Sequence, residues 1–135
     1  MACTNNKLVV KIQSGEVRSF GFTVKNKSEL QQPDGSYYTP MDLTEYLVDF
    51  QIKEYPYASV TPIIHKVLDL AEDSDNGWIY DPTKGKFEVV ITLEDMDMLI
   101  PGKEYNLVIT LINGDTRIII SGEGDNVGVF MVCNS

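Results

Sequence analysis

Apolar and polar residues alternate along most of this chain. The clearest run is 86–93, in which every second side chain is large and apolar. Successive side chains of a β-strand point to opposite faces, so a period of two predicts a strand with one buried and one solvated face. Ile91 and Leu107 are among the side chains that we therefore expect in the core. The segments with this pattern are 7–12, 19–25, 46–53, 63–67, 86–93, 105–111, 117–120 and 127–132.

Turn residues separate these segments. Ser14-Gly15 follows the first run, and the Gly-rich segment 122–126 precedes the last one. Asn113-Gly114 stands between two runs rich in β-branched residues, which is the strongest short-range indication of a hairpin. The chain therefore reads as a series of short strands joined by tight connections.

Helical patterning is confined to one short segment. Thr92 and Asp95 have the spacing of a capping box, and Pro101-Gly102 would end a helix. We expect a single turn at 94–99 that carries the chain from one sheet to another. Seven or eight short strands in 135 residues predict an all-β fold, an immunoglobulin-like two-sheet sandwich of antiparallel strands. A closed barrel is the alternative, and either would form a single domain over 1–135.

Two polar segments interrupt the alternation. Segment 25–40 contains the turn residues Pro33-Asp34-Gly35 and is expected to be a projecting loop or hairpin. Segment 69–86 is expected to be a second projecting loop. Loops of this length in a small domain are often functional.

Six aromatic side chains lie in or beside the predicted loops and not in the strand interiors, and they are the candidate contacts to a partner. Large amphipathic rings are typical of protein interfaces, because they supply contact area at a small entropic cost. Stacking on sugars is an alternative role, and rings folded back onto their own sheet would have a structural one. The six residues are Tyr37, Tyr38, Tyr55, Tyr57, Trp78 and Tyr80.

The charge balance excludes some partners. The chain has 11 Lys and Arg against 20 Asp and Glu, a formal net charge of −9. Surfaces that follow phosphate backbones or anionic lipids need clustered cations, so we expect neither nucleic acid nor a membrane as a partner. The start of the chain lacks the pattern of a signal peptide, and no segment approaches the ~20 apolar residues of a membrane span. We expect synthesis in a cytosol-like compartment.

Groups for catalysis or metal binding are scarce. His65 is the only histidine and is a candidate general base, but no nucleophile motif accompanies it, so we interpret it as a satisfied residue of a sheet, flanked by Ile63 and Val67. Cys3 and Cys133 lack the spacing of a metal or redox motif and are expected to be free thiols, with a disulfide as the alternative if the two ends meet.

The acidic segment 69–76 is the best candidate for a Ca²⁺ site. Read from Asp73, however, the spacing fails the EF-hand template, because Gly77 comes one position early and Lys84 replaces the bidentate glutamate. We therefore expect a solvated acidic loop. The sequence predicts no catalytic, cofactor-binding or metal-binding residues.

The order of several short motifs resembles a known family. Residues 20–24 (FGFTV) precede a loop with Asp34-Gly35, and 40–44 (PMDLT) lead into 48–53 (VDFQIK). The series continues with 85–91 (GKFEVVI), 101–109 (PGKEYNLVI), 121–124 (SGEG) and 127–132 (VGVFMV). Over about residues 17–132 this order is similar to the immunoglobulin-like domains of tailed-bacteriophage virion proteins, especially the N-terminal domain of the phage baseplate upper protein family.

The resemblance implies a non-enzymatic, structural role in a virion, and it carries over no catalytic residues. Members of the baseplate family continue into further assembly regions, whereas this sequence ends at Ser135. We therefore expect an auxiliary or decoration protein that binds the major capsid protein after synthesis in the host bacterial cytoplasm. The alternatives are a baseplate, tail or neck adaptor that binds other virion proteins, and a carbohydrate-binding module.

Overall fold

The computed structural model describes residues 8–13, 15, 17–27, 30–33, 35–55, 60–121 and 128–133. Within these residues the chain forms eleven strands and two short helical elements. The strands are β1 (Leu8–Gln13), β2 (Arg18–Thr23), β3 (Lys25–Lys27), β4 (Tyr38–Pro40), β5 (Leu47–Lys53), β6 (Ile64–Leu68), β7 (Gly77–Asp81), β8 (Lys86–Ile91), β9 (Tyr105–Asn113), β10 (Thr116–Ser121) and β11 (Gly128–Cys133). The helical elements are the 3-10 turn η1 (Pro82–Lys84) and the α-helix α1 (Leu93–Asp97).

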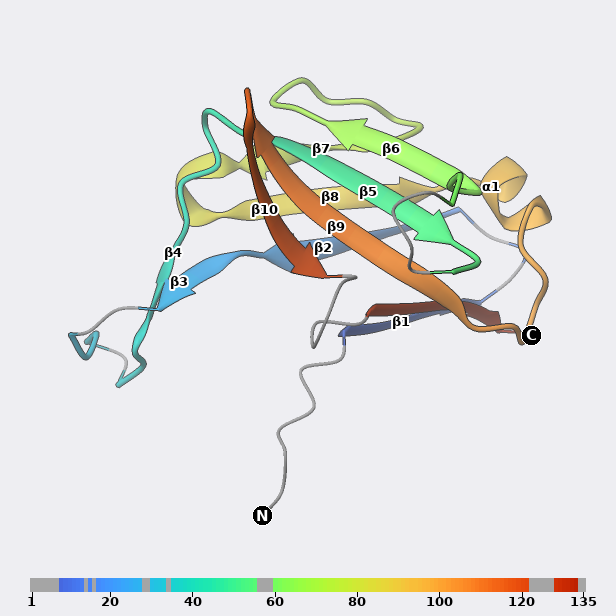
Figure 1. The fold of residues 1–135 in the computed structure, drawn as a ribbon, viewed down its shortest axis with the longest axis horizontal. Helices are drawn as coiled ribbons and strands as arrows, with labels where there is room; N and C mark the ends of the chain where they lie inside the picture. Colours follow the sequence, from blue (N-terminus) through green and yellow to red (C-terminus); the bar gives the residue numbers. More distant parts are fainter. Residues whose placement is uncertain are drawn as a thin grey trace, which may run out of the picture.

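The strands form two main sheets (Figure 1). The larger sheet has the order β1-β11-β9-β5-β6, with β10 pairing along the second half of β9. The smaller sheet has the order β2-β8-β7 and lies behind the larger one in Figure 1. The all-β sandwich expected from the alternation is therefore confirmed, and β9 and β10 form the hairpin expected at Asn113-Gly114.

One strand pair departs from the antiparallel expectation. β1 pairs with β11 in parallel, from Leu8 opposite Gly128 to Gln13 opposite Cys133. Alternation fixes which face of a strand is apolar but not the direction of its neighbour. Parallel strands cannot be joined by a tight turn, so no turn residues in the sequence indicate such a pair.

The inner faces of the two sheets share one hydrophobic core. Ile91 of β8 and Leu107 of β9 are fully buried, as predicted. Phe22 stacks on Phe87 with ring centroids 5.1 Å apart, which joins β2 to β8. A fully buried side chain of this size contributes about 1.5–3 kcal/mol relative to an exposed one, so these alternating positions drive the packing of the sheets.

Segment 69–86 is not a single projecting loop. It contains β7, which pairs with β8 and extends the smaller sheet, and then η1. Gly77 begins β7 with a φ of +111°, and a Cβ atom there would lie 2.0 Å from the carbonyl oxygen of Glu88. The strand was missed because Ile79 is its only large side chain buried in the core, which leaves too short an alternation to recognise.

Segment 25–40 is a hairpin, one of the two forms expected for it. β3 pairs antiparallel with β4, and the pair projects away from the two main sheets (Figure 1). Near its tip, the backbone N–H of Gly35 donates to the carbonyl of Gln32 at 2.8 Å, and Asp34 lies outside the described residues. The Gly-rich segment 122–126 is also outside them.

The base of this hairpin is fixed to the smaller sheet at Gly85. The Val24 N–H donates to the Gly85 carbonyl at 2.8 Å, and the Met41 N–H donates to the Val24 carbonyl at 3.0 Å. Gly85 has a φ of +70°, and a Cβ atom there would lie 2.4 Å from the Val24 carbonyl oxygen. The close approach of these backbones therefore requires glycine.

The single helical turn connects the two sheets as predicted. α1 follows β8 of the smaller sheet and precedes β9 of the larger one. The Asp95 N–H donates to the Thr92 hydroxyl at 3.1 Å, and the Thr92 N–H donates to the Asp95 carboxylate at 2.9 Å. This reciprocal pair is the capping box expected from the sequence.

Candidate interaction surfaces

Two of the candidate aromatic residues lie on a strand of the smaller sheet and not in a loop. Trp78 and Tyr80 are two residues apart on β7, so they share the outer face of the smaller sheet. Their ring centroids are 6.5 Å apart with a 50° tilt. A Cβ atom at Gly21 on β2 would lie 3.7 Å from the Tyr80 hydroxyl, so the Tyr80 side chain reaches across β8. We call Trp78 and Tyr80 the aromatic patch.

Tyr37 and Tyr38 belong to the projecting hairpin. They are 49% and 53% exposed, and Tyr38 is the first residue of β4. The Tyr38 N–H donates to the Ser36 hydroxyl at 2.9 Å, and the Gln32 N–H donates to the Ser36 carbonyl at 2.7 Å. The two rings are therefore presented on an element whose backbone is held by local hydrogen bonds.

Tyr55 is exposed at the opposite end of β5 from the hairpin. The hairpin precedes β5 and Tyr55 follows it, and a strand of this length spans about 20 Å. Tyr57 lies outside the described residues. The described contact candidates therefore lie on three elements, which are the hairpin, the aromatic patch and the end of β5, and the length of β5 separates Tyr55 from the hairpin.

His65 has a carboxylate partner that the sequence did not reveal. Its Nε2 atom lies 2.9 Å from Asp49 Oδ2 across the β5–β6 pair, and Gln51 Nε2 donates to Asp49 Oδ1 at 2.9 Å. The imidazole is exposed on the outer face of the larger sheet. Within the described residues, the hydrogen bonds of the ring include no serine, threonine or cysteine. The satisfied sheet histidine that we expected is the arrangement found, with 45% of the side chain exposed.

Carboxylates of the acidic segment accept hydrogen bonds from backbone N–H groups of the same segment. Asp69 accepts from the Ala71 N–H at 2.8 Å, and Asp73 accepts from the N–H groups of Asp75 and Asn76 at 2.9 and 3.2 Å. The hydrogen bond from the Asp75 backbone is the main reason that the pKa of Asp73 lies below its ordinary value. No three acidic, His or Cys side chains in the described ranges are placed to hold a metal ion together.

Sequence reasoning missed a buried lysine on β6. The core-facing residues of this strand are Ile64, Lys66 and Leu68, so the His65 and Val67 positions face outward. The Lys66 side chain is only 4% exposed. The sequence did contain an indication, because Lys66 stands at the same alternate positions as Ile64 and Leu68 and therefore on their face of the strand. Its charge, however, argues against burial unless its partners are known.

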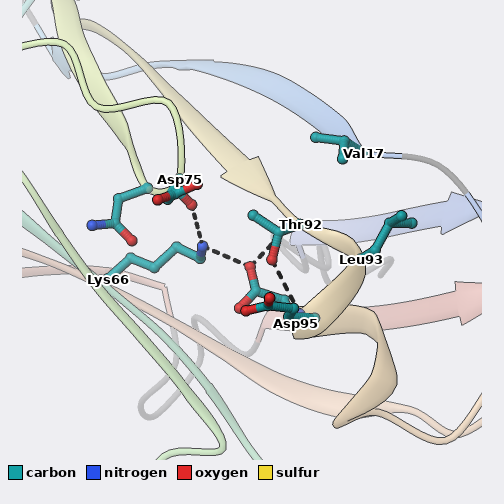
Figure 2. A pocket seen from close by; sticks show the side chains of 8 residues that line it. Val17, Lys66, Asp75, Thr92, Leu93 and Asp95 are labelled. Carbon is teal, nitrogen blue, oxygen red and sulfur yellow. Dashed lines mark hydrogen bonds and ion pairs between the residues drawn. The ribbon is translucent and has the colours of Figure 1, made fainter.

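The partners of Lys66 come from separate elements (Figure 2). Its Nζ atom lies 2.7 Å from Asp95 Oδ2 in α1, and it donates to the Asp75 carbonyl at 2.7 Å in the turn before β7. These groups surround a hollow of about 460 Å³, with Val17 and Leu93 on its other side. Lys66 thus joins the larger sheet to the smaller sheet and to the helix that connects them.

Cys133 on β11 is a half-buried free thiol, as expected, whereas Cys3 lies outside the described residues. No helix in the described part of the chain is long and apolar enough to cross a membrane. The sequence matches no protein-family model and no curated protein. Functional interpretation therefore depends on the motifs and on the surfaces described above.

Proposed function

We propose that this chain is a non-enzymatic structural protein of a tailed-bacteriophage virion, and that it binds the capsid as an auxiliary or decoration protein. The order of motifs supports the virion assignment. Residues 20–24 begin on β2, 48–53 lie on β5, and 85–91 lead into and form β8. These three motifs that resemble virion proteins therefore coincide with strands of one sandwich.

The projecting hairpin is the observation that supports binding to a partner. Tyr37 and Tyr38 are about half exposed on it, and its base is held at Gly85 by backbone hydrogen bonds. A fixed element with exposed aromatic rings has already lost much of the conformational entropy that binding would cost. The hairpin is therefore suited to dock against a second protein.

Quantitative mass spectrometry of purified particles tests the assignment. We expect copies of the chain in proportion to the major capsid protein. A small number of copies per particle would instead favour a baseplate, tail or neck adaptor. Absence from purified particles would contradict the virion role altogether.

A binding experiment with purified particles tests the hairpin. The double variant Tyr37→Ala/Tyr38→Ala should lose co-sedimentation with particles but keep the wild-type unfolding midpoint, because both rings are exposed. Tyr55→Ala is the matched control, since it removes an equally exposed ring at the other end of β5. Loss of binding in the control alone would move the contact away from the hairpin.

The aromatic patch favours a second candidate, a carbohydrate-binding module. Trp78 and Tyr80 lie side by side on an outer sheet face, where a sugar could stack. Loss of glycan binding in Trp78→Ala would support this function. A glycan array with no bound sugar would exclude it for the sugars tested.

A further inference from the structure

An open edge of the smaller sheet runs along β2 and continues into the hairpin. Among the described strands, β2 pairs only with β8, and Val24 connects it directly to β3, which pairs only with β4 (Figure 1). Both partners lie on the same side, because the Val24 N–H donates to the Gly85 carbonyl before β8 and the Val24 carbonyl accepts from the Met41 N–H after β4. Residues 19–27 therefore form one edge, about 30 Å long, which we call the β2–β3 edge.

The backbone groups that point outward from this edge follow from the pairing. In an antiparallel pair, alternate residues bond to the partner strand and the residues between them point away from it. Val24 and its even-numbered neighbours bond toward β8 and β4. The same alternation on β8 directs the Val90 N–H away from β2, and it donates to the Asn76 carbonyl at 3.0 Å. The outward residues of the β2–β3 edge are therefore Ser19, Gly21, Thr23, Lys25 and Lys27.

Two other edges are less suited to a further strand. On β4 the Tyr38 N–H already donates to the Ser36 hydroxyl, and Pro40 has no N–H to donate. β7, at the other side of the smaller sheet, pairs with β8 in an irregular register. Bulges and prolines protect a sheet edge from pairing. The β2–β8 register has no shift and residues 19–27 contain no proline, so a further strand could follow the β2–β3 edge along its length.

The charge of the β2–β3 edge is opposite to that of the whole chain, which has a net charge of −9. Residues 19–27 include Lys25 and Lys27 and no acidic residue. One strand further in, β8 carries one lysine and one glutamate on its outer face, Lys86 and Glu88, whose charges balance. Opposite charges on neighbouring strands stabilise a pair, and like charges destabilise it. The lysines therefore favour an anionic strand and oppose a cationic one.

We propose that the β2–β3 edge binds an extended acidic segment of a protein partner, which adds a strand to the smaller sheet. In this mode of recognition the main-chain hydrogen bonds supply affinity, and the alternate side chains of the added strand supply specificity. Aspartate or glutamate at alternate positions of the segment can lie across from Lys25 and Lys27. β3 also belongs to the projecting hairpin, but the inference goes beyond the proposed function and does not depend on the virion assignment.

Amide hydrogen exchange followed by NMR tests the added strand. The probe is a blocked eight-residue peptide that alternates glutamate and valine, and its counterpart alternates lysine and valine. With the acidic peptide at about ten times its dissociation constant, the outward amides of Gly21, Thr23 and Lys25 should exchange about tenfold more slowly, because they exchange only from the unbound chain. The Phe20 and Phe22 amides already bond to β8, so they are the internal control and should change much less.

Variants separate the backbone contribution from the charge. Thr23→Pro removes an outward N–H without breaking a bond to β8, and it should weaken acidic-peptide binding by roughly threefold or more, the loss expected for a hydrogen bond. Thr23→Val is its matched control, because it keeps the N–H. Lys25→Gln should weaken binding by up to about fivefold, the range of an exposed ion pair. Lys11→Gln is the control for charge, because it removes an exposed lysine from β1 of the larger sheet.

Three results would overturn the proposal. One is unchanged exchange of the outward amides with the acidic peptide, and this wild-type result decides the question even if Thr23→Pro does not fold. Another is equal protection by the acidic and the lysine peptides, or equal weakening by Thr23→Pro and Thr23→Val. The third is protection without peptide that rises with protein concentration, because the edge would then pair with a second copy of the chain.

Discussion

Two lysine–carboxylate pairs in this molecule have the same chemistry and opposite settings. In the Lys66–Asp95 pair the side chains are 4% and 14% exposed, whereas in the Lys103–Glu54 pair they are 37% and 45% exposed. The buried pair joins β6 to α1, and Lys66 also contacts the turn before β7. The exposed pair joins the end of β5 to the connection before β9, although β5 and β9 are already paired along their length.

The difference shows where a charge contributes to the fold. A buried charge has lost its hydration, so removal of its partner leaves a large penalty. An exposed charge keeps most of its hydration, and its ion pair adds little. Substitutions in the buried pair, the exposed pair and the apolar core should therefore differ in their effect on the free energy of unfolding.

Lys66→Met should be the most damaging of these changes. It keeps an apolar stem but leaves the mostly buried Asp95 without its cation and the Asp75 carbonyl without its donor. We expect a loss of about 3–5 kcal/mol in the free energy of unfolding, the usual cost of breaking a buried ion pair from one side. Urea unfolding followed by circular dichroism measures it.

A second variant separates lost charge from lost packing. Lys66→Met/Asp95→Asn replaces both charges, and the asparagine oxygen can still accept from the Thr92 N–H in the capping box. The double variant should recover part of the stability lost by Lys66→Met alone. If it is less stable than the single variant, the cost does not come from an unpaired carboxylate.

Leu107→Ala and Ile91→Ala measure how much one core side chain of each sheet contributes to the free energy of unfolding. Both side chains are fully buried, one in the larger sheet and one in the smaller. Each change should cost about 2–5 kcal/mol in urea unfolding, from lost burial and the cavity that remains. Val67→Ala is the control, because this side chain is exposed on the outward face of β6. Equal effects in all three variants would contradict the assigned faces.

The sequence predicted the fold well where alternation was long. Runs such as 86–93 and 105–111 identify β8 and β9 because several buried positions repeat in phase. β7 was not recognised as a strand, and segment 25–40 could be predicted only as a loop or a hairpin, because these strands are short and bury few apolar side chains. The parallel direction of β1 could not be predicted either, since it depends on pairing with β11, which is distant in the sequence.

The surfaces were less predictable than the fold. Tyr37, Tyr38 and Tyr55 are exposed, as contact residues must be, but their separation depends on the direction of β5. Likewise, no spacing rule brings Lys66 of β6 to Asp95 of α1, because they are 29 positions apart in the sequence and meet only when the sheets pack. Polar groups that meet across a sandwich require the tertiary structure.

Lys103→Gln should have a much smaller effect than Lys66→Met. Its hydrogen bond with Glu54 is the main reason that the pKa of Lys103 lies above its ordinary value, but both side chains keep contact with water. We expect no change in the urea midpoint beyond experimental error at moderate salt, since salt screens exposed pairs. A loss as large as that of Lys66→Met would contradict the role of burial.

Asp73→Asn should have the smallest effect, and it should appear as a dependence on pH. Asp73 holds the turn from which the Asp75 carbonyl accepts the Lys66 hydrogen bond. The Asp75 N–H is the main cause that lowers the pKa of Asp73 below its ordinary value of 3.8. Because the folded chain binds this proton more weakly than the unfolded chain, the stabilisation is complete above pH 3.8 and is lost as the pH falls through the folded pKa. The stability difference between wild type and Asp73→Asn, measured by urea unfolding across the acid range, should therefore shrink below pH 3.8. A difference that stays constant with pH would show that the carboxylate charge at this turn does not stabilise the fold beside Lys66.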